Sequence, residues 1–189
     1  MSAVPDEAEV IAATRRWIER AVIGLNLCPF ARAPYLKDQV RIVVSPARDE
    51  ETLLLDLCEE LQRLVVTDEA QIETTLLVHP QVLGDFLAFN DFLDLADAAL
   101  VEMKLDGELQ VASFHPDYQF GDAPADDPAN YTNRSPFPTL HLLREASIER
   151  AVEAVEDTDA IYERNMARLR AMGREGWEAL WHARAESPE

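Results

Sequence analysis

Two histidines of this chain end strand-like segments, and each is followed by proline. Segments 77–80 and 113–116 read LVHP and SFHP, and segment 43–46 reads VVSP, so the pattern recurs about every 35 residues, the length of one strand-plus-helix unit. A neutral imidazole can act as a base, an acid or a metal ligand near neutral pH. We therefore expect His115 to be a general acid or base, with His79 orienting it or sharing its proton. The alternative is that each ring only hydrogen-bonds a loop carbonyl.

Cys28 is the third candidate for chemistry. It lies in the segment 26–30 (NLCPF), at the exit of a predicted first helix. A nucleophilic cysteine needs a pKa lowered by a histidine, an arginine or a helix amino terminus, and Arg32 is near in sequence. We expect Cys28 to be a nucleophile or redox thiol if it reaches the histidines. The alternative is a small buried hydrophobic residue, which we also expect for Cys58 on the apolar stripe of its helix.

The segment 130–139 carries the features of an anion pocket. Its polar groups precede a proline suited to the first position of a helix, whose free N–H groups attract negative charge. Arg134 could grip a carboxylate or phosphate with two hydrogen bonds. We expect the substrate to contact these residues: Asn26, Tyr118, Asn130, Asn133, Arg134, Ser135, His141 and Arg144. The last two would share one face of the predicted helix 138–155. The alternative is a rigid loop whose asparagines cap turns.

A metal site is a second hypothesis. The histidines His79, His115 and His141, with Cys28 or Asp117, would suit zinc or iron. No pair of these residues has the local spacing of a metal motif, so no metal ligand is assigned. The sequence also lacks the phosphate-binding and dinucleotide-binding glycine motifs, which leaves the cofactor unknown. A third hypothesis is a non-catalytic ligand-binding or interaction module.

The predicted elements must bring these residues together. Strands are expected at 40–45, 73–79 and 109–115, with helices at 49–66 and 82–103 between them. This alternation favours a parallel sheet, whose carboxyl ends gather at one edge, where ligands bind. We expect a single α/β domain, 1–189, with a small, mostly parallel sheet of three to four strands, helices on its faces and a helical C-terminal region. The long loop 117–136 would close the site, and 183–189 would be a frayed tail.

Composition limits the partners. The chain has 189 residues and a formal net charge of −19, which disfavours binding to nucleic acid and to anionic membranes. Residues 1–9 lack the apolar core of a secretory signal, and no apolar run has the length of a membrane span. Two cysteines do not make a disulfide framework, so a reducing cytoplasm is expected. The expected partner is a small anionic molecule, and the oligomeric state is open.

Three motifs carry a resemblance to a known family. The segments 24–30 (GLNLCPF), 112–116 (ASFHP) and 130–145 resemble the bacterial domain of unknown function 1415 family. The similarity extends from about Trp17 to Trp181. The resemblance implies no activity and no catalytic residue. From the residues themselves we expect an enzyme that acts on a small anionic metabolite, by histidine or cysteine chemistry at the carboxyl edge of the sheet.

Overall fold

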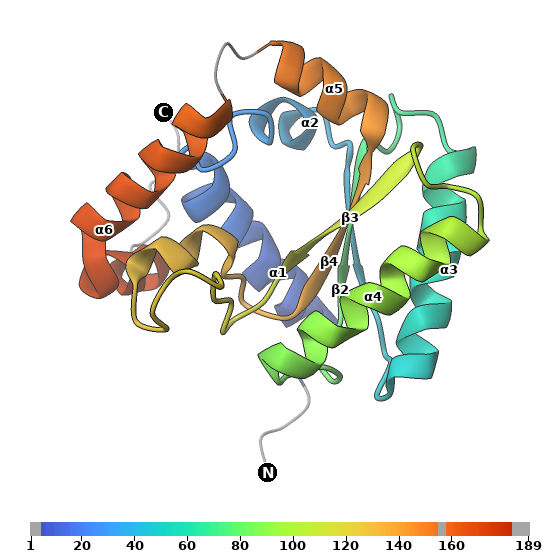
Figure 1. Ribbon diagram of the computed structural model, residues 1–189, viewed down its shortest axis with the longest axis horizontal. Helices are drawn as coiled ribbons and strands as arrows, with labels where there is room; N and C mark the ends of the chain where they lie inside the picture. Colours follow the sequence, from blue (N-terminus) through green and yellow to red (C-terminus); the bar gives the residue numbers. More distant parts are fainter. Residues whose placement is uncertain (1–4, 155–157, 183–189) are drawn as a thin grey trace.

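The computed structural model describes residues 5–154 and 158–182, which fold into a four-stranded sheet with helices on both faces (Figure 1). The helices before the second strand are α1 (Glu7–Trp17), which continues as the π-helix η1 (Ile18–Ile23), α2 (Arg32–Leu36) and α3 (Glu50–Val66). The later helices are α4 (Phe86–Glu102), the 3-10 helix η2 (Pro128–Asn133), α5 (Glu145–Glu153) and α6 (Thr158–His182). The strands are β1 (Val40–Val44), β2 (Thr74–Val78), β3 (Leu109–Phe114) and β4 (Thr139–Arg144).

The sheet is mixed, so the prediction of a mostly parallel sheet is wrong. Its strand order is β1-β2-β4-β3, and only β1 and β2 pair in parallel. β4 runs antiparallel to both of its neighbours. The segment 138–155, predicted to be one helix, instead divides into β4 and α5. Its apolar residues fit either spacing, and the position between two strands decides, because β-strand formation depends on cross-strand packing more than on local preference.

The three predicted strands keep a common direction. Because β4 is antiparallel to both β2 and β3, β1, β2 and β3 all point the same way, and their carboxyl ends lie at one edge of the sheet. The residues that follow β2 and β3 are anchored there by backbone hydrogen bonds. His79 N donates to Pro138 O at 3.0 Å, and His115 N donates to Asn133 O at 3.2 Å. The expected gathering of strand ends is therefore confirmed, although β4 separates β2 from β3.

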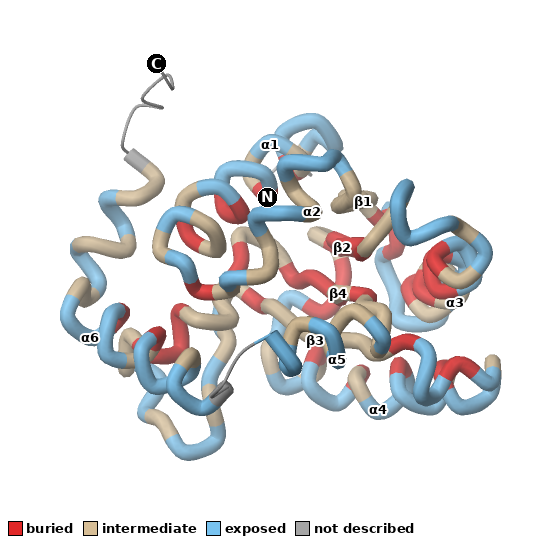
Figure 2. The backbone as a smooth tube through the Cα atoms, turned by 90° about the horizontal axis from the view of Figure 1, so that it is seen from above, coloured by how far each residue is buried: buried red, intermediate tan, exposed pale blue. Residues whose placement is uncertain are grey.

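One face of the sheet is covered by α3 and α4. Each helix begins at an aspartate that caps it: Asp49 accepts from Thr52 N at 2.8 Å, and Asp85 accepts from Ala88 N at 3.0 Å. Fully buried residues recur at helical spacing along α3, namely Leu53, Leu57, Leu61 and Leu64. They belong to the same core as Leu77 on β2 and Leu140 and Leu142 on β4. Figure 2 shows buried residues along β2, β4 and the inner side of α3. This layer forms the larger hydrophobic core.

The opposite face carries α1, η1, η2 and α6. Its buried residues are fewer and more aromatic, and they include Trp17, Ile18, Ala21, Leu76, Tyr131 and Leu169. Gly173 has φ 65° and ψ −175° and breaks α6 into two parts. That φ lies in the left-handed region, which glycine adopts without strain. Within the described part of the chain, no helix is long and apolar enough to cross a membrane.

Candidate functional site

The histidines predicted to be catalytic are sealed in the larger core. His79 and His115 are fully buried, and their rings lie 5.6 and 5.1 Å from the ring of Phe89. His79 Nδ1 is 3.1 Å from Val82 O, and His115 Nε2 is 3.1 Å from Leu83 O. Both rings thus hold the connection between β2 and α4. They make the loop-carbonyl contact that was the structural alternative.

Burial sets the protonation of these two rings. Desolvation lowers the pKa of His79 to about 4 and also lowers the pKa of His115, so both are neutral at pH 7. The N–H of Asp117 donates to His115 Nδ1 at 3.0 Å, so both ring nitrogens of His115 are paired. His79 Nε2 is buried without a hydrogen-bond partner among the described residues. Of the four ring nitrogens, only His79 Nε2 lacks a partner among the described residues, and it is buried.

The loop 117–136 is held together by the polar residues that were expected to bind a substrate. Asn130, which is fully buried, accepts from Phe120 N at 3.0 Å and donates to Pro124 O at 2.8 Å. Arg134 donates to Tyr118 O at 3.1 Å and to Ala125 O at 3.0 Å. The guanidinium of Arg134 also lies 5.0 Å from the ring centroid of Tyr131. These contacts tie the loop to itself, as in the rigid-loop alternative.

Other parts of the expected anion pocket are occupied by the protein. Ser135 Oγ donates to Phe137 O at 2.6 Å. Arg144 donates to Leu64 O, Thr67 O and Ile72 O at 2.8, 2.8 and 2.9 Å. The segment after residue 138 is β4, so the helix amino terminus predicted there does not exist. His141 and Arg144 lie on this strand, where side chains alternate between faces, and the shared helix face is wrong.

A cavity of about 480 Å³ lies on the other face of the sheet, between the strands and the segments η1, α2 and α5. Its floor is made of residues from all four strands, and its roof comes from η1, from residues 28–34 and from α5. His141 is opposite Leu76 on β2 and Ala112 on β3, which places it between the two neighbouring strands of the floor. The lining includes Trp17, Ile18, Val22, Cys28, Phe30, Thr74, Leu76, Ala112, Phe114, Asn133, His141, Leu143 and Ile148. The size and the mostly apolar walls are typical of small-molecule sites.

The tautomer of His141 is fixed by Thr74. The Thr74 hydroxyl donates its only hydrogen to Leu142 O at 2.6 Å. Since His141 Nε2 lies 2.8 Å from the same hydroxyl oxygen, this nitrogen must be the donor of their hydrogen bond. The proton of the neutral ring is therefore on Nε2, and Nδ1 keeps a lone pair. Desolvation lowers the pKa of His141 to about 4, so the ring is neutral at pH 7.

Cys28 reaches the same cavity from a turn that α6 holds in place. Asn165 Nδ2 donates to Leu27 O at 2.7 Å, Arg164 donates to Asn26 O at 3.0 Å, and Arg168 donates to Leu25 O. Burial raises the pKa of the Cys28 thiol, and the backbone N–H groups of the two residues before α2 offset only part of that effect. The thiol is therefore protonated at neutral pH. Asn26 has φ 51° and is not among the described residues that line the cavity.

The comparison with protein families shows the family of this chain. The profile of the family described as "Protein of unknown function (DUF1415)" matches residues 9–179. The chain belongs to the DUF1415 family. The match confirms the predicted resemblance, and it covers most of α1, the four strands and every residue named above as lining the cavity. A search of curated proteins and a search of solved structures each found no match.

The cavity unites only part of the predicted site of this DUF1415 protein. Cys28, Asn133, His141 and Arg144 line it, and Tyr118 is not among its described lining residues. His79, His115, Asn26, Asn130, Arg134 and Ser135 are not among its described lining residues. The predicted site thus divides between two faces of the sheet. The roles predicted for these residues remain predictions.

Sequence reasoning missed three contributors to the cavity. Thr74 orients His141, Ala112 leaves space beside it, and the π-helix η1 contributes two lining residues. Single π-helical turns are frequent at functional sites, but no residue pattern predicts one. A strand assignment for 139–144 would have placed His141 on the face opposite Leu140 and Leu142, because the side-chain period of a strand is two.

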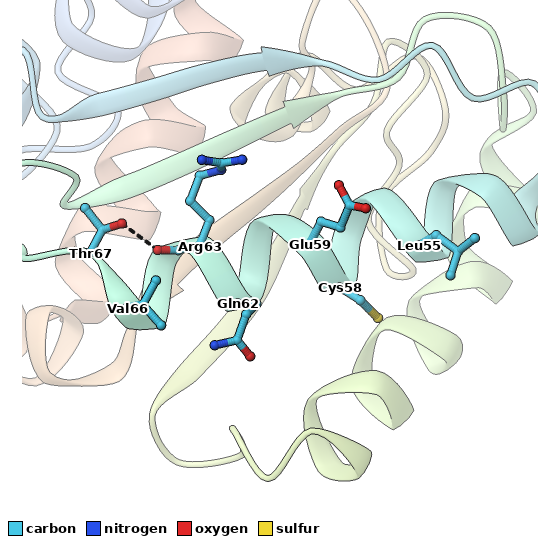
Figure 3. Close-up of a pocket in the computed structure, with 7 residues that line it drawn as sticks. All are labelled: Leu55, Cys58, Glu59, Gln62, Arg63, Val66 and Thr67. Carbon is cyan, nitrogen blue, oxygen red and sulfur yellow. Dashed lines mark hydrogen bonds between the residues drawn. The ribbon is translucent and has the colours of Figure 1, made fainter.

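A second hollow, of about 670 Å³, lies on the outer surface of α3 (Figure 3). All seven lining residues come from α3 and from Thr67 just after it. The hydrogen bond drawn there joins Thr67 Oγ1 to Arg63 O at 2.6 Å, and it belongs to the end of the helix. Burial raises the pKa of the Cys58 thiol in this hollow. Because a single helix supplies the walls, we regard the cavity that holds Cys28 and His141 as the candidate site.

The metal hypothesis receives no support from the geometry. Among the described residues, no group of three or more histidine, cysteine, aspartate or glutamate side chains is placed to hold a metal ion. His79 and His115 bind loop carbonyls, and His141 binds Thr74.

Proposed function

We propose that this protein binds a small, uncharged and mostly apolar molecule in the cavity that Cys28 and His141 line. The observation that carries the proposal is the cavity itself. It has a volume of about 480 Å³ and mostly apolar walls, and its polar side chains include Cys28, Asn133 and His141, which come from distant parts of the chain. A concave, mostly apolar site with a few convergent polar groups is the usual form of a small-molecule site.

The charges around the cavity favour a neutral ligand over the anionic metabolite expected from the sequence. Nη2 of Arg144 donates to backbone carbonyls and its Nε is buried without a partner among the described residues, while His141 is uncharged because its pKa is about 4. Glu73 adds a carboxylate to the lining. A buried anion without a paired cation is costly, so a charged ligand would bind weakly.

The chemistry that this cavity could support is thiol chemistry. Cys28 brings a protonated thiol and His141 a neutral ring with a lone pair on Nδ1, so a molecule in the cavity meets a thiol and an imidazole from two distant parts of the chain. Both cysteines are free thiols, which suits a cytoplasmic, reducing location.

A neutral fluorescent probe tests the binding function. N-phenyl-1-naphthylamine is apolar and fluoresces strongly when it leaves water, and its 8-sulfonate is the matched anion. We expect the wild-type protein to bind the neutral probe at least about tenfold more tightly than the sulfonate. Ala112→Leu, which fills the floor beside His141, should weaken binding of the neutral probe by about tenfold or more.

The control for this variant is Ala98→Leu, the same change at an exposed position of α4. It should leave probe binding unchanged. Equal binding by the wild type and by a folded Ala112→Leu variant, with far-ultraviolet circular dichroism as the check on folding, would overturn the proposed site. If the sulfonate bound more tightly than the neutral probe, the anionic ligand expected from the sequence would be favoured instead.

A further inference from the structure

We infer that the ligand of this cavity donates a hydrogen bond, from an N–H or O–H group, to Nδ1 of His141. The inference rests on the proposed function and names the chemical class of its ligand. The class is a neutral molecule with an apolar body and at least one donor group, such as an aromatic amine, an amide or an alcohol.

The hydrogen bonds of the Thr74 hydroxyl determine which nitrogen of His141 carries the proton. Its hydroxyl has one hydrogen, and Leu142 O takes it at 2.6 Å. His141 Nε2, at 2.8 Å from the Thr74 oxygen, can only donate to it. Both partners belong to the sheet, since Thr74 begins β2 and Leu142 lies on β4. The strand pairing therefore holds His141 in one tautomer, with the acceptor nitrogen at Nδ1.

Nδ1 of His141 has no hydrogen-bond partner among the described residues, and it is not one of the buried unpaired atoms, so it stays accessible. His141 lines the cavity, and the residue as a whole is half-buried. A ligand that displaces water from Nδ1 without supplying a donor leaves this acceptor unpaired, and a ligand that has a donor avoids that loss of free energy.

Ligands that can only accept hydrogen bonds do not match Nδ1 of His141. A carbonyl or carboxylate oxygen at Nδ1 would face a lone pair, because the neutral ring has its proton on the other nitrogen. A site that offers an acceptor in this way discriminates against analogues that lack the donor. The ring of Phe114, 5.8 Å from that of His141, and the ring of Trp17, 5.0 Å from Phe114, give the ligand aromatic contacts beside its donor.

A pair of probes in which a methyl group replaces the hydrogen of the N–H group tests the inference. N-phenyl-1-naphthylamine has an N–H group, and N-methyl-N-phenyl-1-naphthylamine does not. For the wild-type protein we expect the N–H probe to bind about five- to tenfold more tightly, the gain of about one hydrogen bond. In His141→Phe, which keeps a flat ring but has no acceptor, the ratio should fall to about one. Comparing the ratio between proteins removes the steric effect of the methyl group.

The outcomes separate the two proposals. If the wild type binds both probes and the same ratio persists in His141→Phe, the donor inference is wrong and the binding function stands. If the wild type binds neither probe, the binding function fails, and the inference fails with it.

A measurement on the wild type covers the case in which His141→Phe does not fold. The imidazole ¹⁵N shifts of His141 should show the Nε2–H tautomer in the free protein. The Nδ1 signal should move on addition of the N–H probe and stay in place with the N-methyl probe. A free protein with the proton on Nδ1, or equal shifts with both probes, would overturn the inference.

Discussion

Asn165 donates a hydrogen bond of 2.7 Å to the carbonyl of Leu27, and this contact joins α6 to the turn that carries Cys28. Asn165 is only 4% exposed, so the contact is shielded from water. The C-terminal helix therefore positions the one thiol of the candidate site, although the two residues are far apart in the sequence.

Replacing Asn165 by leucine should loosen this turn. The Leu27 carbonyl would lose its partner, and an unpaired buried acceptor costs about 1–3 kcal/mol of unfolding free energy. Urea denaturation would measure that loss. In a Cys58→Ser background, the alkylation rate of Cys28 should also rise. A variant as stable as the wild type, with an unchanged alkylation rate, would show that α6 does not hold the turn.

The reactivity of Cys28 itself gives a second prediction. Because burial raises the pKa of its thiol, iodoacetamide should modify it more slowly at pH 7.5 than it modifies free cysteine, and the rate should increase as the pH rises. Labelling followed by mass spectrometry, again in the Cys58→Ser background, measures the rate. Urea-unfolded protein provides the reference for an exposed thiol. A native rate above that reference would reveal a stabilised thiolate and favour a catalytic cysteine in the resting protein.

Stability should fall in mildly acidic solution because of two histidines. The pKa values of His79 and His141 are about 4 in the folded protein, against an ordinary value of 6.5. The unfolded chain therefore binds protons first. The stabilising contribution of each neutral ring is complete above pH 6.5 and is lost as the pH falls toward 4. Each ring should account for a loss of about 2 kcal/mol between pH 7.5 and 5.

Urea denaturation at the two pH values, for the wild type and for His79→Asn, isolates one of these contributions. The variant removes the titrating ring but keeps a donor for the Val82 carbonyl. Its loss of stability over this range should be smaller than that of the wild type by about 2 kcal/mol. Identical pH dependence in the two proteins would mean that His79 is not the buried neutral ring described above.

A variant of Arg144 distinguishes a structural role of this residue from the substrate-binding role expected of it. Arg144→Met keeps much of the length of the side chain but removes the two N–H groups of Nη2, which contact three backbone carbonyls at the end of α3 and beyond it. We expect a loss of about 3 kcal/mol or more of unfolding free energy, since hydrogen bonds to charged groups contribute about 1.5–3 kcal/mol each. Thermal denaturation would check it. An unchanged melting temperature together with lost probe binding would support the substrate role instead.

Much of the fold could be predicted from local signals. The succession β1, α3, β2, α4, β3 follows from strand-length apolar runs and from helices with one apolar stripe that begin at Asp49 and Asp85. β4 could not be predicted in this way, because residues 139–152 fit both periods. Only the long-range pairing with β2 and β3 selects the strand.

Some members of the candidate site could be predicted, but its geometry could not. Cys28 and His141 are residue types that carry chemistry, and whether they line one cavity depends on the register of β4. A slip of one residue would place His141 on the face of α3 and α4 and Leu142 on the floor of the cavity. The histidines at the strand ends were expected at one edge and lie there, but their rings point into the core, which no local pattern shows.

The insertion of β4 between β2 and β3 has a consequence for synthesis on the ribosome. β3 hydrogen-bonds only to β4 within the sheet, and β4 is the last strand to be made. While the ribosome has synthesised β3 but not yet all of β4, β3 has no strand to pair with. Its pairing must wait for β4, and contacts between segments far apart in the sequence form slowly. The sheet closes at its centre rather than by adding strands outward, so a truncated chain ending before β4 should fail to fold cooperatively.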